Sequence, residues 1–376
     1  MTDLQPLPAA ALPPGIRARI LPGINGLAMH ILEAGHEGGD RPLILLLHGF
    51  PELAYSWRKA MPPLAAAGYR VVAPDQRGYG RTTGWDGAYD GDLGAFRLLN
   101  LVRDALALVA ALGHREAAAV IGHDFGSPVA AWCALTRPDI FRSVALMSAP
   151  FGGPPAPPAA AAPRAPDIDE ALAALPRPRK HYQWYYSTRA ADADMRDCRQ
   201  GIHDFLRAYY HMKSADWPAN KPFKLAAWSA DELARLPTYY VMDRDRTMAE
   251  TVAPEMPSPA AITACRWLPD DELRIYSDAF AHTGFQGGLQ WYRCATGGKF
   301  AAELEPFAGR AIDVKSCFIA GTSDWGVYQK PGDFERMQAS ACTRMVGCHL
   351  VAGAGHWVQQ EQPDEVTRLL LDFLRR

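Results

Sequence analysis

The chain has 376 residues, of which 48% are hydrophobic and 21% are charged. This length and composition predict one large domain or two smaller ones, with enough apolar side chains to form a sizeable core. A formal net charge of −2 gives no electrostatic reason to expect nucleic acid or an anionic membrane as a partner.

The cysteines and the N-terminal segment indicate the cellular compartment. Seven cysteines are scattered along the chain, and they form neither a Cys-x-x-Cys pair nor a cluster at zinc spacing. We therefore expect free thiols in a reducing compartment and no metal site. The first 14 residues lack a basic start and a long apolar run, and no stretch reaches the length of a membrane-spanning helix. A cytoplasmic protein is the expectation.

The first 150 residues alternate predicted strands with predicted helices. Asn25-Gly26 is a turn signal between two apolar runs, which predicts a hairpin from about residue 17 to residue 32. Buried strands are predicted at four short apolar runs: 42–47, 71–73, 118–121 and 144–147. Apolar residues recur at helical spacing over 96–112. This alternation predicts an α/β fold with a mostly parallel, doubly wound sheet and helices on both faces.

Three polar residues come directly after predicted strands: His48, Asp75 and Asp124. In open parallel sheets, ligands bind at the carboxyl ends of the strands. We therefore expect these three residues to lie at one edge of the sheet, where a ligand would bind.

The alternation stops after Pro150. Residues 152–166 are rich in Pro and Ala, and we expect them to form a mobile connection. From about residue 171 to residue 291 the sequence is helical and aromatic without clear buried strands, which predicts an inserted helical cap. Strands return at 317–320 and 349–351, and an amphipathic helix closes the chain. The expected domains are a core of residues 1–150 and 296–376 and a cap of residues 151–295.

The strand at 118–121 runs into Gly122-His123-Asp124-Phe125-Gly126, and an apolar helix follows. Glycine at both ends of such a turn is the pattern of a nucleophile elbow, which points its central side chain into a pocket. The central residue here is Asp124 instead of the usual serine. The alternative without a catalytic role is that Asp124 only caps the helix.

An aspartate at the elbow changes the chemistry that the site can perform. A serine that attacked an sp3 carbon would end as an ether, which water does not readily cleave. A carboxylate that attacks one ends as an ester, which water cleaves at the carboxyl carbon. Asp124 therefore favours displacement at an alkyl carbon, such as that of an epoxide or a carbon–halogen bond, over acyl transfer.

Two later loops supply the other residues that this chemistry needs. Asp324 ends Gly321-Thr322-Ser323-Asp324 after a predicted strand, and His356 lies in a glycine-flanked loop before the last helix. The order nucleophile, acid, histidine is that of the α/β-hydrolase triad. We expect His356 to act as general base on water, and Asp324 to fix its tautomer and stabilise the imidazolium.

An oxyanion hole is expected from the backbone N–H groups of Phe50 and Phe125. Its target is the tetrahedral carbon that forms when water attacks the ester of Asp124. His48 and Pro51 are expected to shape the loop that presents Phe50, and His123 is given no role.

Four motifs together resemble the epoxide hydrolases of the α/β-hydrolase fold: His48-Gly49-Phe50-Pro51, Gly78-Tyr79-Gly80-Arg81-Thr82, Gly122–Gly126 and Gly355-His356-Trp357. Two cap segments, 181–186 and 283–293, are also similar to segments of this family. By this resemblance Tyr182 and Tyr292 are the two phenols that protonate the epoxide oxygen. The resemblance spans the chain from about Pro42 to its C-terminus.

The resemblance implies an epoxide hydrolase that converts an epoxide and water to a vicinal diol through an ester on Asp124. No metal or organic cofactor is implied. The aromatic cap favours an apolar small-molecule epoxide, and the oligomeric state is left open between monomer and homodimer.

Three alternatives are kept open. A haloalkane dehalogenase shares the elbow and triad, but Phe125 offers no indole N–H to a halide where many relatives have Trp. Neither position 125 nor position 128 carries the Arg found beside the elbow in fluoroacetate dehalogenases. An esterase is disfavoured by Asp124, and a ligand-binding member without catalysis is the third alternative.

Overall fold

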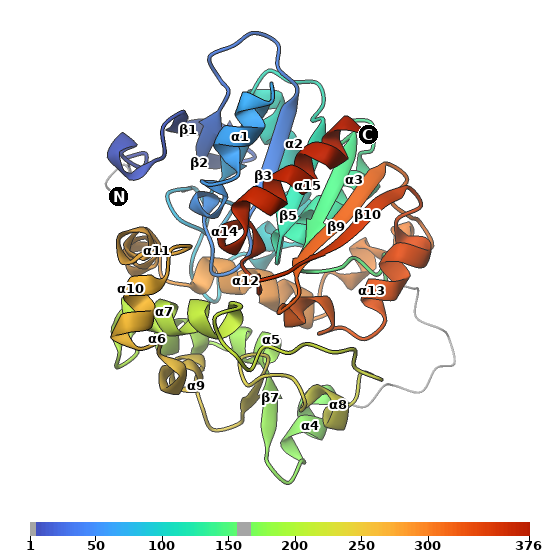
Figure 1. Cartoon of the computed structure of the whole chain (residues 1–376). Coiled ribbons are helices and arrows are strands. Elements are labelled where there is room, and N and C mark those ends of the chain that lie inside the picture. The colour runs from blue at the N-terminus through green and yellow to red at the C-terminus, as the bar shows by residue number, and fades with distance from the viewer. Residues whose placement is uncertain (1–4, 156–166) are drawn as a thin grey trace.

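A computed structural model describes residues 5–155 and 167–376 of the chain. Figure 1 shows a twisted sheet with helices on both faces in the upper part of the molecule and a group of further helices beneath it. Most of the connection predicted at 152–166 lies outside the described residues.

One sheet of eight strands organises the upper part, in the order β1-β2-β4-β3-β5-β6-β9-β10. Its strands are β1 (Ile16–Ile24), β2 (Leu27–Ala34), β3 (Leu43–Leu47), β4 (Arg70–Pro74), β5 (Ala119–His123), β6 (Ser143–Met147), β9 (Lys315–Gly321) and β10 (Met345–Val351). β2 runs antiparallel to both β1 and β4, and all other neighbours are parallel. The predicted fold class, with its mostly parallel sheet, is confirmed.

The central strands are mostly apolar because both faces of the sheet are covered. Every residue of β3, β5 and β6 is buried. Leu47 of β3 pairs with Gly122 of β5, and Gly122 pairs with Leu146 of β6. The carboxyl ends of these three strands are therefore level, so the residues that follow them emerge at the same edge.

Helices cover the two faces of this sheet. They are α1 (Met61–Ala66), α2 (Leu98–Ala111), α3 (Gly126–Thr136), α13 (Asp333–Arg336), α14 (Val358–Glu361) and α15 (Pro363–Arg375). In Figure 1, α1 and α15 lie in front of the strands, whereas α2 and α3 lie behind them. α2 buries Leu101, Ala105 and Leu108, and α15 buries Val366 and Leu370. This helical spacing gives each helix one apolar face toward the sheet.

Between β6 and β9 the chain forms the cap. Its helices are α4 (Ile168–Ala173), α5 (Tyr182–Tyr186), α6 (Ala191–Arg196), α7 (Gly201–Lys213), α8 (Ala230–Leu233), α9 (Met248–Val252), α10 (Pro259–Ala264), α11 (Asp270–Thr283) and α12 (Gln286–Thr296). All eight strands of the large sheet come from outside residues 151–295. The division at 150/151 and 295/296 stays a prediction.

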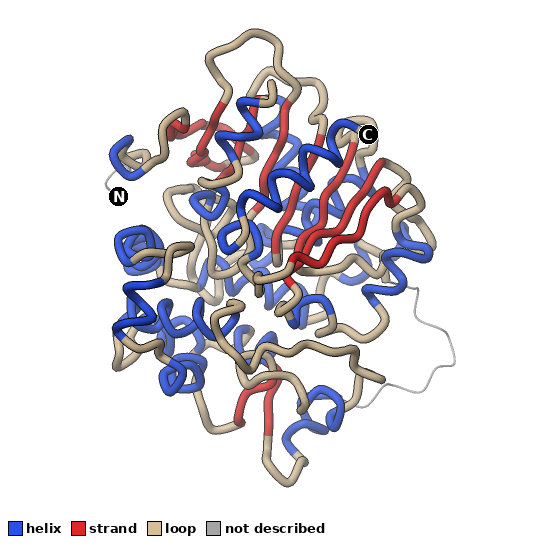
Figure 2. The backbone as a smooth tube through the Cα atoms, in the orientation of Figure 1, coloured by secondary structure: helices blue, strands red, loops and turns tan. Residues whose placement is uncertain are grey.

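The cap also contains a two-stranded antiparallel sheet of β7 (Arg179–His181) and β8 (Val241–Asp243). Figure 2 shows this pair apart from the eight-stranded sheet. The expectation of a cap without buried strands is therefore wrong at these two places. Strands of three residues are too short to produce the alternation by which a strand is recognised in a sequence.

Short helical turns join the larger elements. They are the 3₁₀ turns η1 (Ala9–Ala11), η2 (Ala54–Trp57), η3 (Leu93–Phe96), η4 (Ala253–Glu255), η5 (Ala301–Glu303), η6 (Glu305–Phe307) and η7 (Trp325–Val327), and the π-helical turn η8 (Met337–Ala341). The longest helices described, α2 and α11, have 14 residues each. Within the described ranges, no helix is long and apolar enough to cross a membrane.

Candidate active site

Asp124 stands in a tight turn between β5 and α3. Its φ of 51° lies in the left-handed region, which residues other than glycine rarely adopt. A Cβ on Gly122 would lie 2.0 Å from the carbonyl oxygen of Gly126, and one on Gly126 would lie 2.4 Å from that of Leu47. Glycine is therefore required on both sides of the turn, which has the form of a nucleophile elbow.

Two groups contact the carboxylate of Asp124. The N–H of Phe50 donates to Oδ1 at 3.0 Å, and Nε2 of His356 lies 3.2 Å from Oδ2. Burial raises the pKa of Asp124, but the hydrogen bond and charge of His356, together with the charge of Lys213, outweigh it. The pKa is held well below its usual range. The carboxylate is thus ionised and able to act as a nucleophile.

His356 lies between two carboxylates. Its Nδ1 is 3.1 Å from Oδ1 of Asp324, on the side of the ring away from Asp124. Asp324 follows β9 and caps η7, where the N–H of Gly326 donates to its Oδ1 at 2.7 Å. Burial raises the pKa of Asp324, but the charge and hydrogen bond of His356 outweigh this effect, so the pKa lies below its ordinary value. The charged Asp324 therefore favours a proton on Nδ1 and leaves Nε2 to act as a base.

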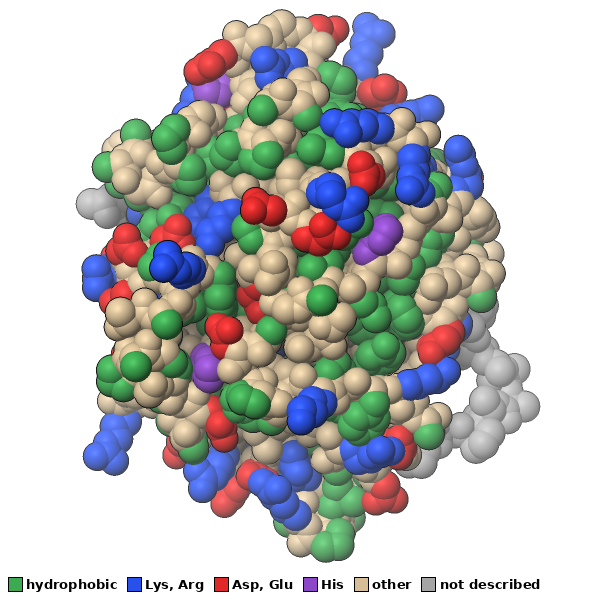
Figure 3. Space-filling view, viewed as in Figure 1, with side chains coloured by type: hydrophobic (Ala, Val, Ile, Leu, Met, Phe, Trp, Pro, Cys, Tyr) green, Lys and Arg blue, Asp and Glu red, His purple; other side chains and the backbone are tan. Residues whose placement is uncertain are grey.

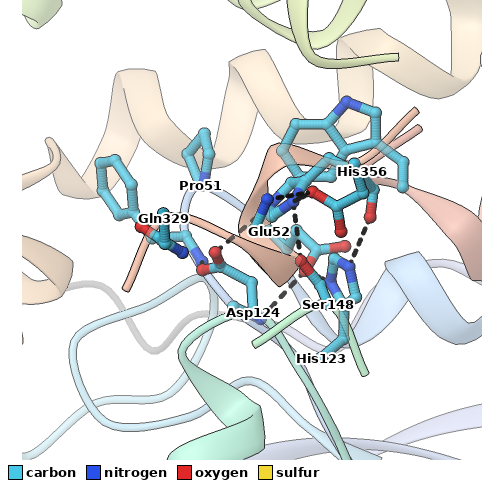
Figure 4. Close-up of polar contacts among 12 residues, drawn as sticks. Pro51, Glu52, His123, Asp124, Ser148, Gln329 and His356 are labelled. Atoms are coloured by element: carbon cyan, nitrogen blue, oxygen red, sulfur yellow. Dashed lines mark hydrogen bonds and ion pairs between the residues drawn. The ribbon is translucent and has the colours of Figure 1, made fainter. Parts of the chain in front are cut away.

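Ser148 is a further contact of the imidazole. It follows β6 with a φ of 68°, and its Oγ lies 2.9 Å from Nδ1 of His356. A Cβ on Gly326 would lie 2.5 Å from this Oγ, so the loop after β9 approaches the hydroxyl closely. Figure 4 shows Ser148 and His356 on one side of Asp124, with Gln329 on the other.

Two cap tyrosines line the same cavity as Asp124. Tyr182 begins α5 and Tyr292 lies on α12, and their ring centroids are 5.9 Å apart. The hydroxyl of Tyr182 donates to Oε1 of Gln329 at 3.0 Å. Burial and then the charge of Asp124 raise the pKa of both phenols well above its usual range. Both phenols are therefore protonated at neutral pH and able to donate.

The cavity has a volume of about 730 Å³ and is lined by residues of both the cap and the sheet layer. Its apolar walls include Phe96, Leu98, Phe125, Trp132, Phe151 and Trp291. Such a cavity, apolar with a few polar groups, is typical of a small-molecule site.

Across residues 5–155 and 167–376, His, Cys, Asp and Glu side chains form no group of three or more that could hold a metal ion.

Comparison with known proteins assigns the chain to a family. Residues 42–246 match the family described as alpha/beta hydrolase fold. Epoxide hydrolase A of Mycobacterium tuberculosis is 36% identical over 361 residues, which cover 93% of this chain and 95% of that protein. Epoxide hydrolase B of the same organism is 32% identical, with 93% and 96% covered. The chain belongs to the epoxide hydrolases of the α/β-hydrolase fold.

Solved epoxide hydrolase structures share the architecture. An epoxide hydrolase from an endophytic Streptomyces superposes with a TM-score of 0.76 at 32% identity, covering 96% of each chain. Epoxide Hydrolase A from Mycobacterium thermoresistibile superposes with a TM-score of 0.72 at 32% identity, covering 96% of this chain and 98% of that one. The family resemblance inferred from the motifs is confirmed.

In this epoxide hydrolase, the residues predicted from the sequence occupy one site. Asp124, His356 and Asp324 form a continuous series of contacts, and the two tyrosines lie in the cavity that Asp124 lines. Phe50 donates its N–H to Asp124. Phe125 directly precedes α3, and its ring packs against Tyr292 with centroids 5.2 Å apart.

Asp75 lies after β4, yet its carboxylate does not join this series of contacts. Its Oδ2 lies 2.8 Å from Nδ1 of His30 and accepts the N–H of Arg81 at 3.0 Å, and its Oδ1 accepts the N–H of Ala54 at 2.9 Å. Asp75 therefore fixes the loops behind the site.

A buried pair, Glu52 and His123, lies behind His356 and was not assigned a role from the sequence. Oε2 of Glu52 is 2.6 Å from Nδ1 of His123, and Nε2 of His123 is 2.7 Å from the carbonyl oxygen of His356. Burial opposes charge on both groups, but each partner's charge overcomes it: the pKa of His123 is raised and that of Glu52 is lowered. An ion pair therefore supports the backbone of His356.

Two features of the sequence could have revealed these additional residues. Glu52 directly follows the motif His48–Pro51, and His123 lies inside the elbow itself. Ser148 follows β6, so the rule that ligands bind at the carboxyl ends of strands applies to it as well.

Proposed function

We propose that Asp124 is the nucleophile of this epoxide hydrolase, that His356 is its general base and that Asp324 orients the base. The geometry of His356 carries this proposal, because its two ring nitrogens lie 3.2 Å from Asp124 and 3.1 Å from Asp324. The base is thus held against the one carboxylate that stands in a strained elbow.

In the first half-reaction, an oxygen of Asp124 attacks a carbon of the oxirane ring. The carbon–oxygen bond of the ring breaks, and its electron pair goes to the ring oxygen, which takes a proton from Tyr182 or Tyr292. The products are a hydroxyalkyl ester on Asp124 and a tyrosinate. Buried phenols with raised pKa values stay protonated until negative charge develops on the ring oxygen, which then accepts the proton.

In the second half-reaction, His356 takes a proton from water while the water oxygen attacks the Asp124 carboxyl carbon. The resulting oxyanion accepts the N–H groups of Phe50 and Phe125. When the intermediate collapses, the leaving alkoxide takes the proton from His356, which completes the diol. The other proton of the water stays on the Asp124 carboxyl group and is then transferred to the tyrosinate, which restores the phenol.

The substrate that fits this site is an apolar small-molecule epoxide. The cavity walls are largely aromatic and aliphatic, and Asp124 and the two phenols are among the polar residues that line it. On the face shown in Figure 3, positive and negative side chains are interspersed without a continuous patch of either sign, which gives no support for a polyanionic partner.

The free state of the cysteine thiols supports a cytoplasmic location for this protein. All seven cysteines of the chain are free in the structure, and three of them are buried. Free thiols are typical of proteins in a reducing compartment.

Haloalkane dehalogenation is the alternative that uses the same triad. One observation weighs against it: the indole N–H of Trp291, which lines the cavity, is donated to the carbonyl oxygen of Arg77 at 3.0 Å. The side chain after the nucleophile is Phe125, which has no N–H to offer a halide.

Turnover of styrene oxide by the wild type and by Asp124→Asn, with a halide-release assay on a bromoalkane in parallel, tests the proposal. Diol from the wild type alone, without halide, is the expected result. Diol from Asp124→Asn at the wild-type rate contradicts the role of Asp124. Halide without diol favours the dehalogenase.

A further inference from the structure

The loop that carries His356 is bonded to the end of cap helix α7. The N–H of His356 donates to the carbonyl oxygen of Lys213 at 2.9 Å, and the indole of Trp357 donates to that of Tyr210 at 2.8 Å. A Cβ on Gly355 would lie 2.5 Å from the carbonyl carbon of Ser214. The two segments therefore pack backbone against backbone, and only glycine allows this approach.

Glu361, the last residue of α14, joins the same two segments through its carboxylate. Its Oε2 accepts the N–H of Gly355 at 2.9 Å and the N–H of Ala215 at 2.8 Å. Its Oε1 accepts the N–H of Trp357 at 3.0 Å. Both oxygens are thus used, and the two donors from the loop flank His356 on either side. Burial raises the pKa of this carboxyl group to about 8, although its three N–H donors lower it.

We propose that Glu361 is a positioning residue for hydrolysis of the ester, a role that rests on the function proposed above. Because the carboxylate holds the residues before and after His356, it fixes the backbone from which the imidazole extends. Its third donor, Ala215, belongs to the cap, so the carboxylate also sets the loop relative to the cap.

The two half-reactions depend on this position to different degrees. Hydrolysis needs Nε2 of His356 at hydrogen-bonding distance from a water that faces the ester carbon, and a displacement of about 1 Å lowers such a rate about 10²-fold. Alkylation of Asp124 needs no base. Loss of the Glu361 carboxylate should therefore slow the second half-reaction and spare the first.

The variant Glu361→Gln tests this role, because it keeps the size of the side chain and replaces one accepting oxygen with an NH₂ donor that cannot accept an N–H. Rapid mixing with styrene oxide, acid quenching and intact-protein mass spectrometry give the rates at which the ester on Asp124 forms and decays. We expect decay at least tenfold slower than in the wild type and formation within about twofold, so that the ester accumulates. Glu365→Gln, which removes an exposed carboxylate paired with Arg368, is the matched control and should behave as the wild type.

A second variant disturbs the contact between the His356 loop and the cap without changing Glu361. Gly355→Ala places a methyl group against the cap backbone, whereas Gly39→Ala, where a Cβ meets nothing within 4 Å, is its control. Gly355→Ala should also slow decay of the ester more than its formation. This variant tests the inference if Glu361→Gln does not fold. Equal slowing of both rates, or decay at the wild-type rate, overturns the inference. Absence of any ester in the wild type instead overturns the function on which it rests.

Discussion

Nε2 of His356 lies 3.2 Å from Oδ2 of Asp124, and in the proposed scheme this imidazole activates the water that hydrolyses the ester on that carboxylate. In the first half-reaction the contact keeps Asp124 ionised. In the second half-reaction of the same scheme, the contact places His356 beside the carboxyl carbon that water attacks. Ester hydrolysis needs a base and alkylation of Asp124 does not. Substitutions at this contact should therefore change the rates of the two half-reactions to different extents.

Replacing the base should trap the covalent intermediate. In His356→Ala, Asp124 still attacks the epoxide, but ester hydrolysis should fall by at least about 10²-fold because no group accepts the proton of water. Intact-protein mass spectrometry after mixing with styrene oxide should show a lasting gain equal to the mass of the epoxide. The double variant with Asp124→Asn should show none. A folded His356→Ala protein that forms no adduct would contradict the scheme.

Replacing the phenols should slow the first half-reaction, in which the epoxide ring opens. Tyr182→Phe and Tyr292→Phe should each slow ring opening about tenfold or more, since each removes a proton donor, and should leave ester hydrolysis nearly unchanged. Single-turnover measurements separate the two rates. Tyr186→Phe is the control, because its ring packs against Tyr292 but its hydroxyl contacts that of Tyr209. Unchanged ring opening in both variants would remove the acid role.

The two partners of Nδ1 in His356 should contribute unequally. Asp324 is charged and stabilises the imidazolium, whereas Ser148 offers a neutral hydroxyl at 2.9 Å. Asp324→Asn should therefore slow ester hydrolysis about 10²-fold or more, and Ser148→Ala less than about tenfold. Decay of the trapped ester in the two variants measures the difference. A larger effect for Ser148→Ala would reverse the assignment of the orienting residue.

The buried pair behind the base should make stability depend on pH. Glu52 has a lowered pKa, so its contribution is present above the ordinary value of 4.5 and is lost as pH falls through the lowered value. His123 has a raised pKa, so its contribution is present below the ordinary value of 6.5 and is lost as pH rises through the raised value. The pair is therefore most stabilising between about pH 4.5 and 6.5.

Denaturant unfolding of the wild type and Glu52→Gln at pH 6 and pH 9 measures this effect. Removal of one partner of a buried pair costs about 3–5 kcal/mol, and the difference between the two proteins should shrink as the pH rises through the raised pKa of His123. Glu365→Gln should change stability little at either pH. Equal stability of the wild type and Glu52→Gln at pH 6 would contradict an ion pair.

The sequence predicted the fold and the principal site residues because each depends on a local pattern. Apolar runs and helical spacing identified the strands and helices of the sheet layer, and glycines around Asp124 and His356 marked sharp turns after strands. The two cap tyrosines came only from resemblance to the family, since no local pattern distinguishes them from other tyrosines of the cap.

The supporting residues could not be predicted because their contacts join distant parts of the chain. Glu52 and His123 are 71 positions apart, and Ser148 and His356 are 208 apart. Glu361 accepts one N–H from a residue 146 positions away in the cap. Their roles become visible only when the sheet and cap are assembled, whereas the short strands β7 and β8 were missed because three residues show no alternation.

The central claim is that water attacks the carboxyl group of Asp124 and not the epoxide. A single turnover of styrene oxide in H₂¹⁸O, with enzyme in excess, tests it most directly. The scheme predicts unlabelled diol, because its new oxygen comes from Asp124, and one ¹⁸O atom in the peptide that contains Asp124. Labelled diol with an unlabelled Asp124 peptide would contradict the ester and show direct attack of water on the ring.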